Sequence, residues 1–90
     1  MPLIYEDFTF TTYKSGGTLQ VTGNVNVSSG LEIELSASVF NARGVWTLIT
    51  WSGSLTGSAA NVTLVAGTGM TLNVPSTPFL DGNSFKVVLS

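Results

Sequence analysis

The chain has 90 residues, and three Lys and Arg against five Asp and Glu give it a formal net charge of −2. His and Cys are both absent, which removes the usual ligands and bases of zinc, haem, blue-copper, Ser-His and Cys-nucleophile sites and excludes most enzyme classes. The isolated basic residues Lys14, Arg43 and Lys86 form no basic stripe, so direct binding to nucleic acid is not expected.

The length allows one domain with one thin core, which leaves a lone monomer marginally stable. Without Cys, no disulfide can stabilise it, so we expect a homo-oligomer. The N-terminal sequence MPLIYEDFTF has no basic region of a signal peptide, and no apolar run approaches the ~20 residues of a membrane span. We therefore expect synthesis in the cytoplasm and no association with a membrane.

The segments are short, rich in β-branched and aromatic residues, and interrupted by Gly, Asn and Ser, which predicts an all-β chain without helices of note. Residues 1–17 are interpreted as an extended N-terminal arm, and residues 18–90 as a single β domain. In the arm, Phe8 and Phe10 alternate with Thr9 and Thr11. Because a small body has little room to bury such side chains, we expect residues 3–13 to pack on another chain.

Residues 18–39 carry apolar pairs that recur every six positions: Leu19/Val21, Val25/Val27, Leu31/Ile33 and Ala37/Val39. Turn-forming residues at 22–24 and 28–30 separate the first three pairs. Two interpretations remain open. The pattern predicts either two tight hairpins followed by one long strand over 31–39, or a short solenoid with short rungs. The body is accordingly a small sandwich or a short solenoid.

Residues 45–51 (VWTLITW) predict a strand that is apolar on both faces, with Val45, Ile49 and Trp51 opposite Trp46 and Leu48. Such a strand is central or lies under a partner subunit. Further strands are expected over 60–66, 70–74 and 85–89. Residues 81–83 (DGN) have the chemistry of a tight hairpin turn.

Three groups of side chains are candidate sites. Glu32 and Glu34 share one strand face but are interpreted as the solvated side of an amphipathic strand, and Asp81 as part of a turn, so no metal, cofactor or catalytic residue is expected. The aromatic residues Tyr13, Trp46 and Trp51 could form the core, an interface or a stacking surface for sugar rings. Arg43, in the turn over 41–44, is either solvated or an interface contact.

Two stretches, 17–30 (GTLQVTGNVNVSSG) and 46–57 (WTLITWSGSLTG), resemble the β-solenoid repeats of bacterial autotransporter passengers and related adhesins. This resemblance implies a β-solenoid adhesin or a glycan-binding module. Autotransporter passengers carry a signal peptide and end in a membrane barrel, and we expect neither feature from this sequence.

As a whole, the short, Cys-free, weakly charged chain with its Ser, Thr, Gly, Asn and Val content resembles the capsid cement or decoration proteins of bacteriophages, and secondarily tail-fibre modules. The cement family implies a non-enzymatic homotrimer on the capsid surface of the virion. Its N-terminal arms would add as strands to neighbouring copies of the major capsid protein.

The interface expected from this reasoning combines the arm with the apolar strand and its preceding turn. Trp46 is the preferred contact of the two tryptophans, because Ile49 and Trp51 share a face with Val45 and form the larger apolar set. The candidate interface residues are Leu3, Tyr5, Phe8, Phe10, Tyr13, Arg43, Trp46 and Trp51.

Overall fold

The computed structural model describes residues 3–5 and 7–90, with side chains from Asp7 onward. Within these residues the chain is all β apart from one 3-10 turn, η1 (Ala59–Asn61), which confirms the predicted fold class. The chain winds through three stacked coils. Coil 1 holds β1 (Leu3–Tyr5) and β2 (Thr12–Ser15); coil 2 holds β3 (Leu19–Val21), β4 (Val25–Asn26) and β5 (Leu31–Leu35); coil 3 holds β6 (Gly44–Trp51), β7 (Leu55–Thr56) and β8 (Val62–Ala66).

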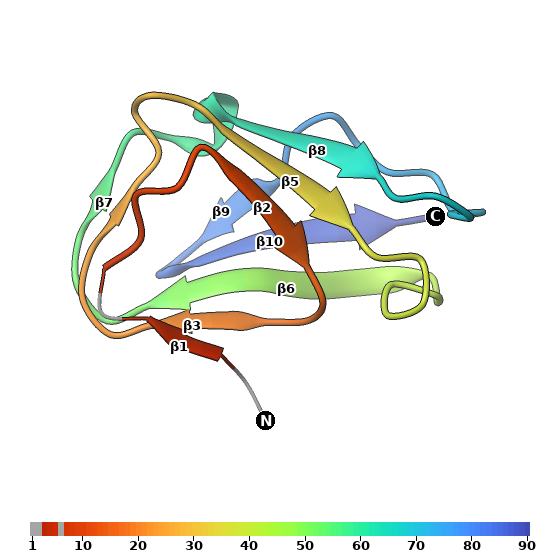
Figure 1. The fold of residues 1–90 in the computed structure, drawn as a ribbon, viewed down its shortest axis with the longest axis horizontal. Coiled ribbons are helices and arrows are strands. Elements are labelled where there is room, and N and C mark those ends of the chain that lie inside the picture. Colours follow the sequence, from red (N-terminus) through yellow and green to blue (C-terminus); the bar gives the residue numbers. More distant parts are fainter. Residues whose placement is uncertain (1–2, 6) are drawn as a thin grey trace.

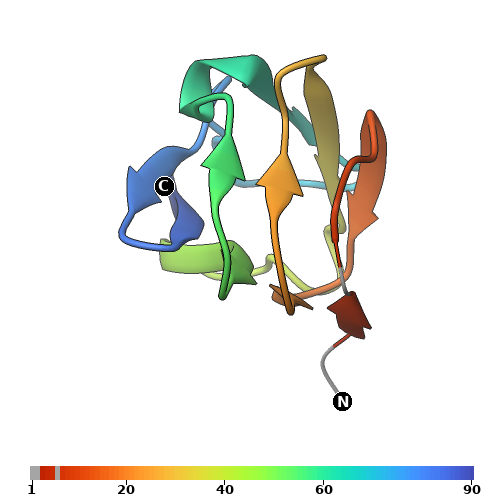
Figure 2. The ribbon, with the colours of Figure 1, turned by 90° about the vertical axis from the view of Figure 1, so that its left-hand side faces the viewer.

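The coils stack through parallel pairing on three sides (Figure 1). Sheet A contains the parallel strands β1, β3 and β6, sheet B the parallel pair β4 and β7, and sheet C the parallel strands β2, β5 and β8. In coil 1, sheet B is continued by a parallel bridge between Phe8 and Val25. Figure 2 looks onto sheet B, where β4 and β7 run side by side in the same direction. The body is therefore a short, three-sided β-solenoid.

The six-residue pattern of the sequence corresponds to the three sides of coil 2. Leu19/Val21, Val25/Val27 and Leu31/Ile33 are buried in sheets A, B and C respectively. The corners between them use glycine at positive φ, 130° at Gly23 and 93° at Gly30. The solenoid interpretation is thus confirmed for residues 19–35, and the two hairpins are wrong because β3, β4 and β5 pair with other coils and not with each other.

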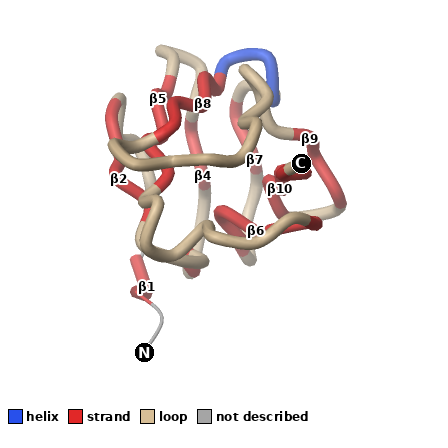
Figure 3. Tube along the Cα trace, turned by 90° about the vertical axis from the view of Figure 1, so that its right-hand side faces the viewer, coloured by secondary structure: helices blue, strands red, loops and turns tan. Residues whose placement is uncertain are grey.

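The predicted strand over 31–39 ends early, at Leu35. Beyond it, a loop over 36–43 carries Phe40 into the core and leads to β6. Opposite sheet B, the described part of the chain has no sheet and returns from sheet C to sheet A through loops of this kind (Figure 3).

A C-terminal hairpin extends sheet A beyond coil 3. Strands β9 (Phe79–Asp81) and β10 (Ser84–Leu89) are antiparallel, and β10 also pairs antiparallel with β6. The turn predicted over residues 81–83 is confirmed, with Gly82 at φ 58°. Because β10 covers the outer edge of β6, the hairpin caps the last coil, as the ends of a solenoid require.

The strand predicted over 70–74 is wrong. These residues form an irregular segment that places Met70, Leu72 and Val74 half-buried against the core. The segment is held by isolated backbone bonds, with the Leu64 N–H donating to the Ser76 carbonyl at 2.8 Å and the Asn73 N–H to that of Ser90 at 2.8 Å. Pro75 and Pro78 lack the N–H groups that a continuous ladder would need.

A β-bulge in β6 changes which side chains face the core. Phe85 of β10 pairs with Ile49 but the next residue, Lys86, pairs with Thr47, so that Leu48 is the extra residue. Both Leu48 and Ile49 are consequently buried. The bulge turns Leu48 and Ile49 inward together, whereas Val45 before it remains exposed, so that β6 still presents an apolar side chain to the outside.

Strand β1 and the residues from Asp7 onward belong to the solenoid body. Strand β1 pairs with β3, β2 pairs with β5, and the Phe8 side chain is 0% exposed. For the described residues, the expectation that 3–13 packs away from the body is therefore wrong. Phe8 fills the interior of coil 1, and among its described residues the sheet B side is formed by the bridge from Phe8 to Val25.

Candidate functional site

Two of the candidate interface residues lie in the core. Phe8 is 0% and Trp51 6% exposed, and the Trp51 ring lies 5.0 Å from that of Phe85. The interface prediction is therefore wrong for both residues. Trp51 follows the bulge, and its register with Val21 directs it inward together with Ile49.

Trp46 precedes the bulge and is half-buried. Its ring lies 5.1 Å from the Phe40 ring, and its Nε1–H donates to the Ala42 carbonyl at 2.9 Å. Trp46 thus anchors the loop that joins β5 to β6, while the neighbouring Arg43 is exposed. The sequence pattern placed Val45 on the same inward face as Ile49 and Trp51. In the structure Val45 faces outward instead and is 62% exposed.

The remaining candidates lie on coil 1. Phe10 is 45% exposed and stacks on Phe8 with ring centroids 5.0 Å apart, and Tyr13 is half-buried with its ring edge-on to Phe8 at 5.7 Å. The side chains of Leu3 and Tyr5 lie outside the described residues. Their backbone pairs with Leu19 and Val21 of β3.

An exposed apolar surface crosses the outer face of sheet A, and we call it the sheet A strip: Val45, Val88 and Phe79, with Lys86 between them. Val45 and Val88 are direct cross-strand neighbours at 62% and 47% exposure, and Phe79, at 42%, pairs with Lys86. Along β10 buried and outward-facing side chains alternate, and this alternation places Val88 opposite the core. The exposure of Val45 could not be inferred, because the bulge shifts the alternation along β6.

The strip contains an ion pair that limits the cost of covering it. Lys86 Nζ lies 2.7 Å from Asp81 Oδ2 across the hairpin, and the Lys86 side chain is 27% exposed. The one cation of the strip is therefore already paired with an anion. Burying a paired charge costs much less than burying a lone one.

The carboxylates of sheet C face outward, as predicted. Glu32 is exposed and Glu34 half-buried, while the residues that alternate with them, Leu31, Ile33 and Leu35, are buried. Glu32 is in register with Thr12, and Glu34 with Lys14. Among the described residues, no group of three or more acidic side chains is arranged to hold a metal ion.

Comparison with protein-family models, curated proteins and solved structures found no match to the chain. In the part of the chain that the structure describes, no helix has the length and apolar character needed to cross a membrane.

Proposed function

We propose that the protein is a non-enzymatic structural component of a bacteriophage particle, a trimeric cement protein that bridges neighbouring copies of the major capsid protein. The observation that supports this proposal is the sheet A strip. Strands β6 and β10 bury their inward apolar side chains, yet they also present Val45 and Val88 side by side to solvent. A contiguous exposed apolar patch on a small domain is typical of a protein interface.

Self-association through the strip gives the chain the additional burial that its size requires. At roughly 25 cal/mol per Å² of apolar surface, covering Val45, Val88 and Phe79 contributes favourably, although the loss of rotational and translational freedom offsets much of the gain. Three strips that meet around a threefold axis exclude water from all of them in one step. Arg43, exposed in the turn before β6, then lies near the rim of the contact.

The major capsid protein would be bound through an edge of sheet A. Strand β1 is at one end of the strand order and β9 at the other. An edge strand offers unpaired backbone N–H and C=O groups to an added strand. We assign the capsid contact to β1, which keeps the strand addition expected of the N-terminal residues but makes them part of the folded body.

The alternative is a β-solenoid adhesin or glycan-binding module, or a fragment of a phage tail fibre. The observation that favours it is the parallel three-coil architecture, which agrees with the solenoid resemblance of residues 17–30 and 46–57. The two functions differ in location, since a cement protein belongs to the capsid surface, whereas an adhesin or fibre module belongs to the cell surface or the tail.

The test is to purify particles of the encoding phage, separate heads from tails and quantify the chain by mass spectrometry. The proposal expects the chain on heads, in a constant ratio to the major capsid protein. Heads assembled without the chain should break at a lower temperature. Recovery with tails alone, or absence from both fractions, would contradict the capsid role and favour the alternative.

A further inference from the structure

The outer face of sheet C is hollowed by two adjoining cavities, of about 370 Å³ and 290 Å³, that share Lys14 and Glu34 in their walls. We call them together the sheet C groove. Its lining includes Phe10, Tyr13, Lys14, Glu32, Glu34 and Thr68. The combined space is in the range of roughly 300–1,000 Å³ that small-molecule sites occupy.

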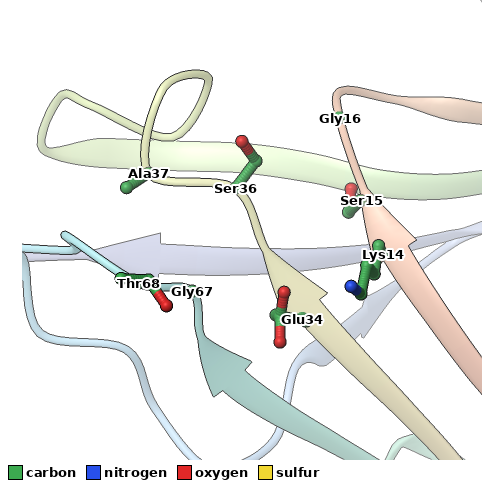
Figure 4. A pocket seen from close by; sticks show the side chains of 8 residues that line it. All are labelled: Lys14, Ser15, Gly16, Glu34, Ser36, Ala37, Gly67 and Thr68. Atoms are coloured by element: carbon green, nitrogen blue, oxygen red, sulfur yellow. The ribbon is translucent and has the colours of Figure 1, made fainter.

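The polar side of the groove is set by the parallel register of β2 and β5. Lys14 is opposite Glu34, and Thr12 opposite Glu32, so four polar side chains form two adjacent rows on one face. Figure 4 shows the side chains of Lys14 and Glu34 on these neighbouring strands, with Thr68 on the far side of the opening. The groove thus offers two carboxylates as acceptors, an ammonium group as a donor, and hydroxyls that serve as both.

The other end of the groove is aromatic. Phe10 lines it and is 45% exposed, while one face of its ring stacks on Phe8 at an interplanar angle of 21°. Phe8 itself is 0% exposed and contacts Tyr13 edge-on. The Phe10 side chain is therefore held in place by its packing on the core. Its side-chain entropy is already lost before binding, so a ligand that contacts Phe10 has little of that cost to offset.

This combination matches the chemistry of a sugar ring. One face of many pyranoses carries only C–H groups and can stack on an aromatic ring, while the rim carries hydroxyls that donate to carboxylates and accept from ammonium groups. An inorganic anion is a poor fit, because two carboxylates would repel it and only one ammonium group would attract it. A metal ion would lack a third acidic ligand among the described residues. A purely apolar ligand would leave the polar rows unpaired.

We propose that the sheet C groove is a saccharide-binding site in which Phe10 stacks on the sugar ring and Glu32, Glu34 and Lys14 bind its hydroxyls. The site lies on a different sheet from the sheet A strip, so it does not depend on the capsid role. On a virion surface it would let the particle adhere to glycans; in an adhesin it would be the principal contact.

The test records amide chemical shifts of the 15N-labelled protein during titration with maltotriose, chitotriose and a chitosan trimer, and in parallel with a basic peptide. At least one saccharide should shift amides of residues 10–15, 32–36 and 67–68 with saturable, millimolar affinity. Phe10→Ala and the isosteric double variant Glu32→Gln/Glu34→Gln should each weaken that binding by about tenfold or more. Phe79→Ala, which removes an exposed aromatic ring from sheet A, is the matched control and should leave binding unchanged.

The double Gln variant keeps the test decisive if Phe10→Ala fails to fold. The proposal is overturned if none of the three saccharides shifts these amides, if the basic peptide alone does, or if the double Gln variant binds with unchanged affinity. None of these outcomes bears on whether the protein is found on phage heads.

Discussion

The side-chain Oδ1 of Asn24 accepts the backbone N–H of Ser54 at 2.8 Å, and so connects the corner of coil 2 to the corner of coil 3. One coil earlier, Asp7 Oδ1 accepts the backbone N–H of Asn24 at 2.9 Å in the same way. At the corner between sheets A and B, side-chain oxygens therefore connect all three coils. They accept the backbone N–H groups that a carbonyl of a neighbouring strand would otherwise bind.

Replacing Asn24 tests the contribution of this corner. In Asn24→Ala the Ser54 N–H loses its acceptor, and because the site is exposed, water compensates in part. We expect the free energy of unfolding to fall by about 1 kcal/mol in urea denaturation. At the exposed Asn73 the backbone makes the bonds to Ser90, so Asn73→Ala should stay within about 0.5 kcal/mol of the wild type. Equal losses in the two variants would contradict the role of the corner.

Stacked corners also require small residues. The Gly53 N–H donates to the Gly23 carbonyl at 2.6 Å, and a Cβ at Gly53 would collide with Asn24 Oδ1 and the Gly23 backbone. We expect Gly53→Ala to destabilise the protein by about 1 to 3 kcal/mol. Gly16 is the control, since a Cβ there meets nothing within 4 Å, and Gly16→Ala should be neutral or stabilising by up to about 1 kcal/mol. A stable Gly53→Ala variant would show that the coils are not in this contact.

The sequence predicts much of the solenoid because each side of coil 2 carries its own apolar pair and each corner its own glycine. It does not predict the direction of pairing, since a pair such as Leu31/Ile33 looks the same in a hairpin and in a parallel coil. Only the separation of partners distinguishes them, and Leu31 pairs with Val62, far along the chain. Contacts of this kind leave no local signal.

The burial of the candidate interface residues was predicted less well, for two physical reasons. The prediction assumed that side chains alternate between the two faces along all of residues 45–51. The bulge breaks this alternation at Leu48, and so Val45 was placed on the wrong face. The aromatic residues of coil 1 were treated as surface because their partners are distant in sequence, yet Phe8 bridges to Val25 and is buried. Glu32 and Glu34 were placed correctly, because β5 has no bulge.

The bulge predicts different roles for the two tryptophans. Trp51→Ala removes a buried ring that packs on Phe85, and should cost roughly 3 to 5 kcal/mol. Trp46→Ala removes a half-buried ring and the bond to Ala42, and should cost less, about 1 to 3 kcal/mol. Thermal and urea unfolding measure both. A larger loss for Trp46→Ala than for Trp51→Ala would contradict the assigned register of β6.

Chelation tests whether the acidic side chains hold a metal. Glu32 and Glu34 lie on the outer face of sheet C, and Asp81 is paired with Lys86. We expect treatment with EDTA to leave the melting temperature of the protein unchanged. A drop of several degrees that calcium restores would identify one of these carboxylates as a ligand.

The most direct test of the central claim is the mass of the protein in solution, measured by sedimentation equilibrium at micromolar concentration. We predict a trimer of about 28 kDa for the wild type, from a chain of 9.4 kDa. The double variant Val45→Lys/Val88→Lys should sediment as a folded monomer, because six unpaired cations would meet at the axis. Thr63→Lys, on the exposed face of sheet C, should remain trimeric. A wild-type protein that sediments at 9.4 kDa, or a double Lys variant that remains trimeric, would contradict the account.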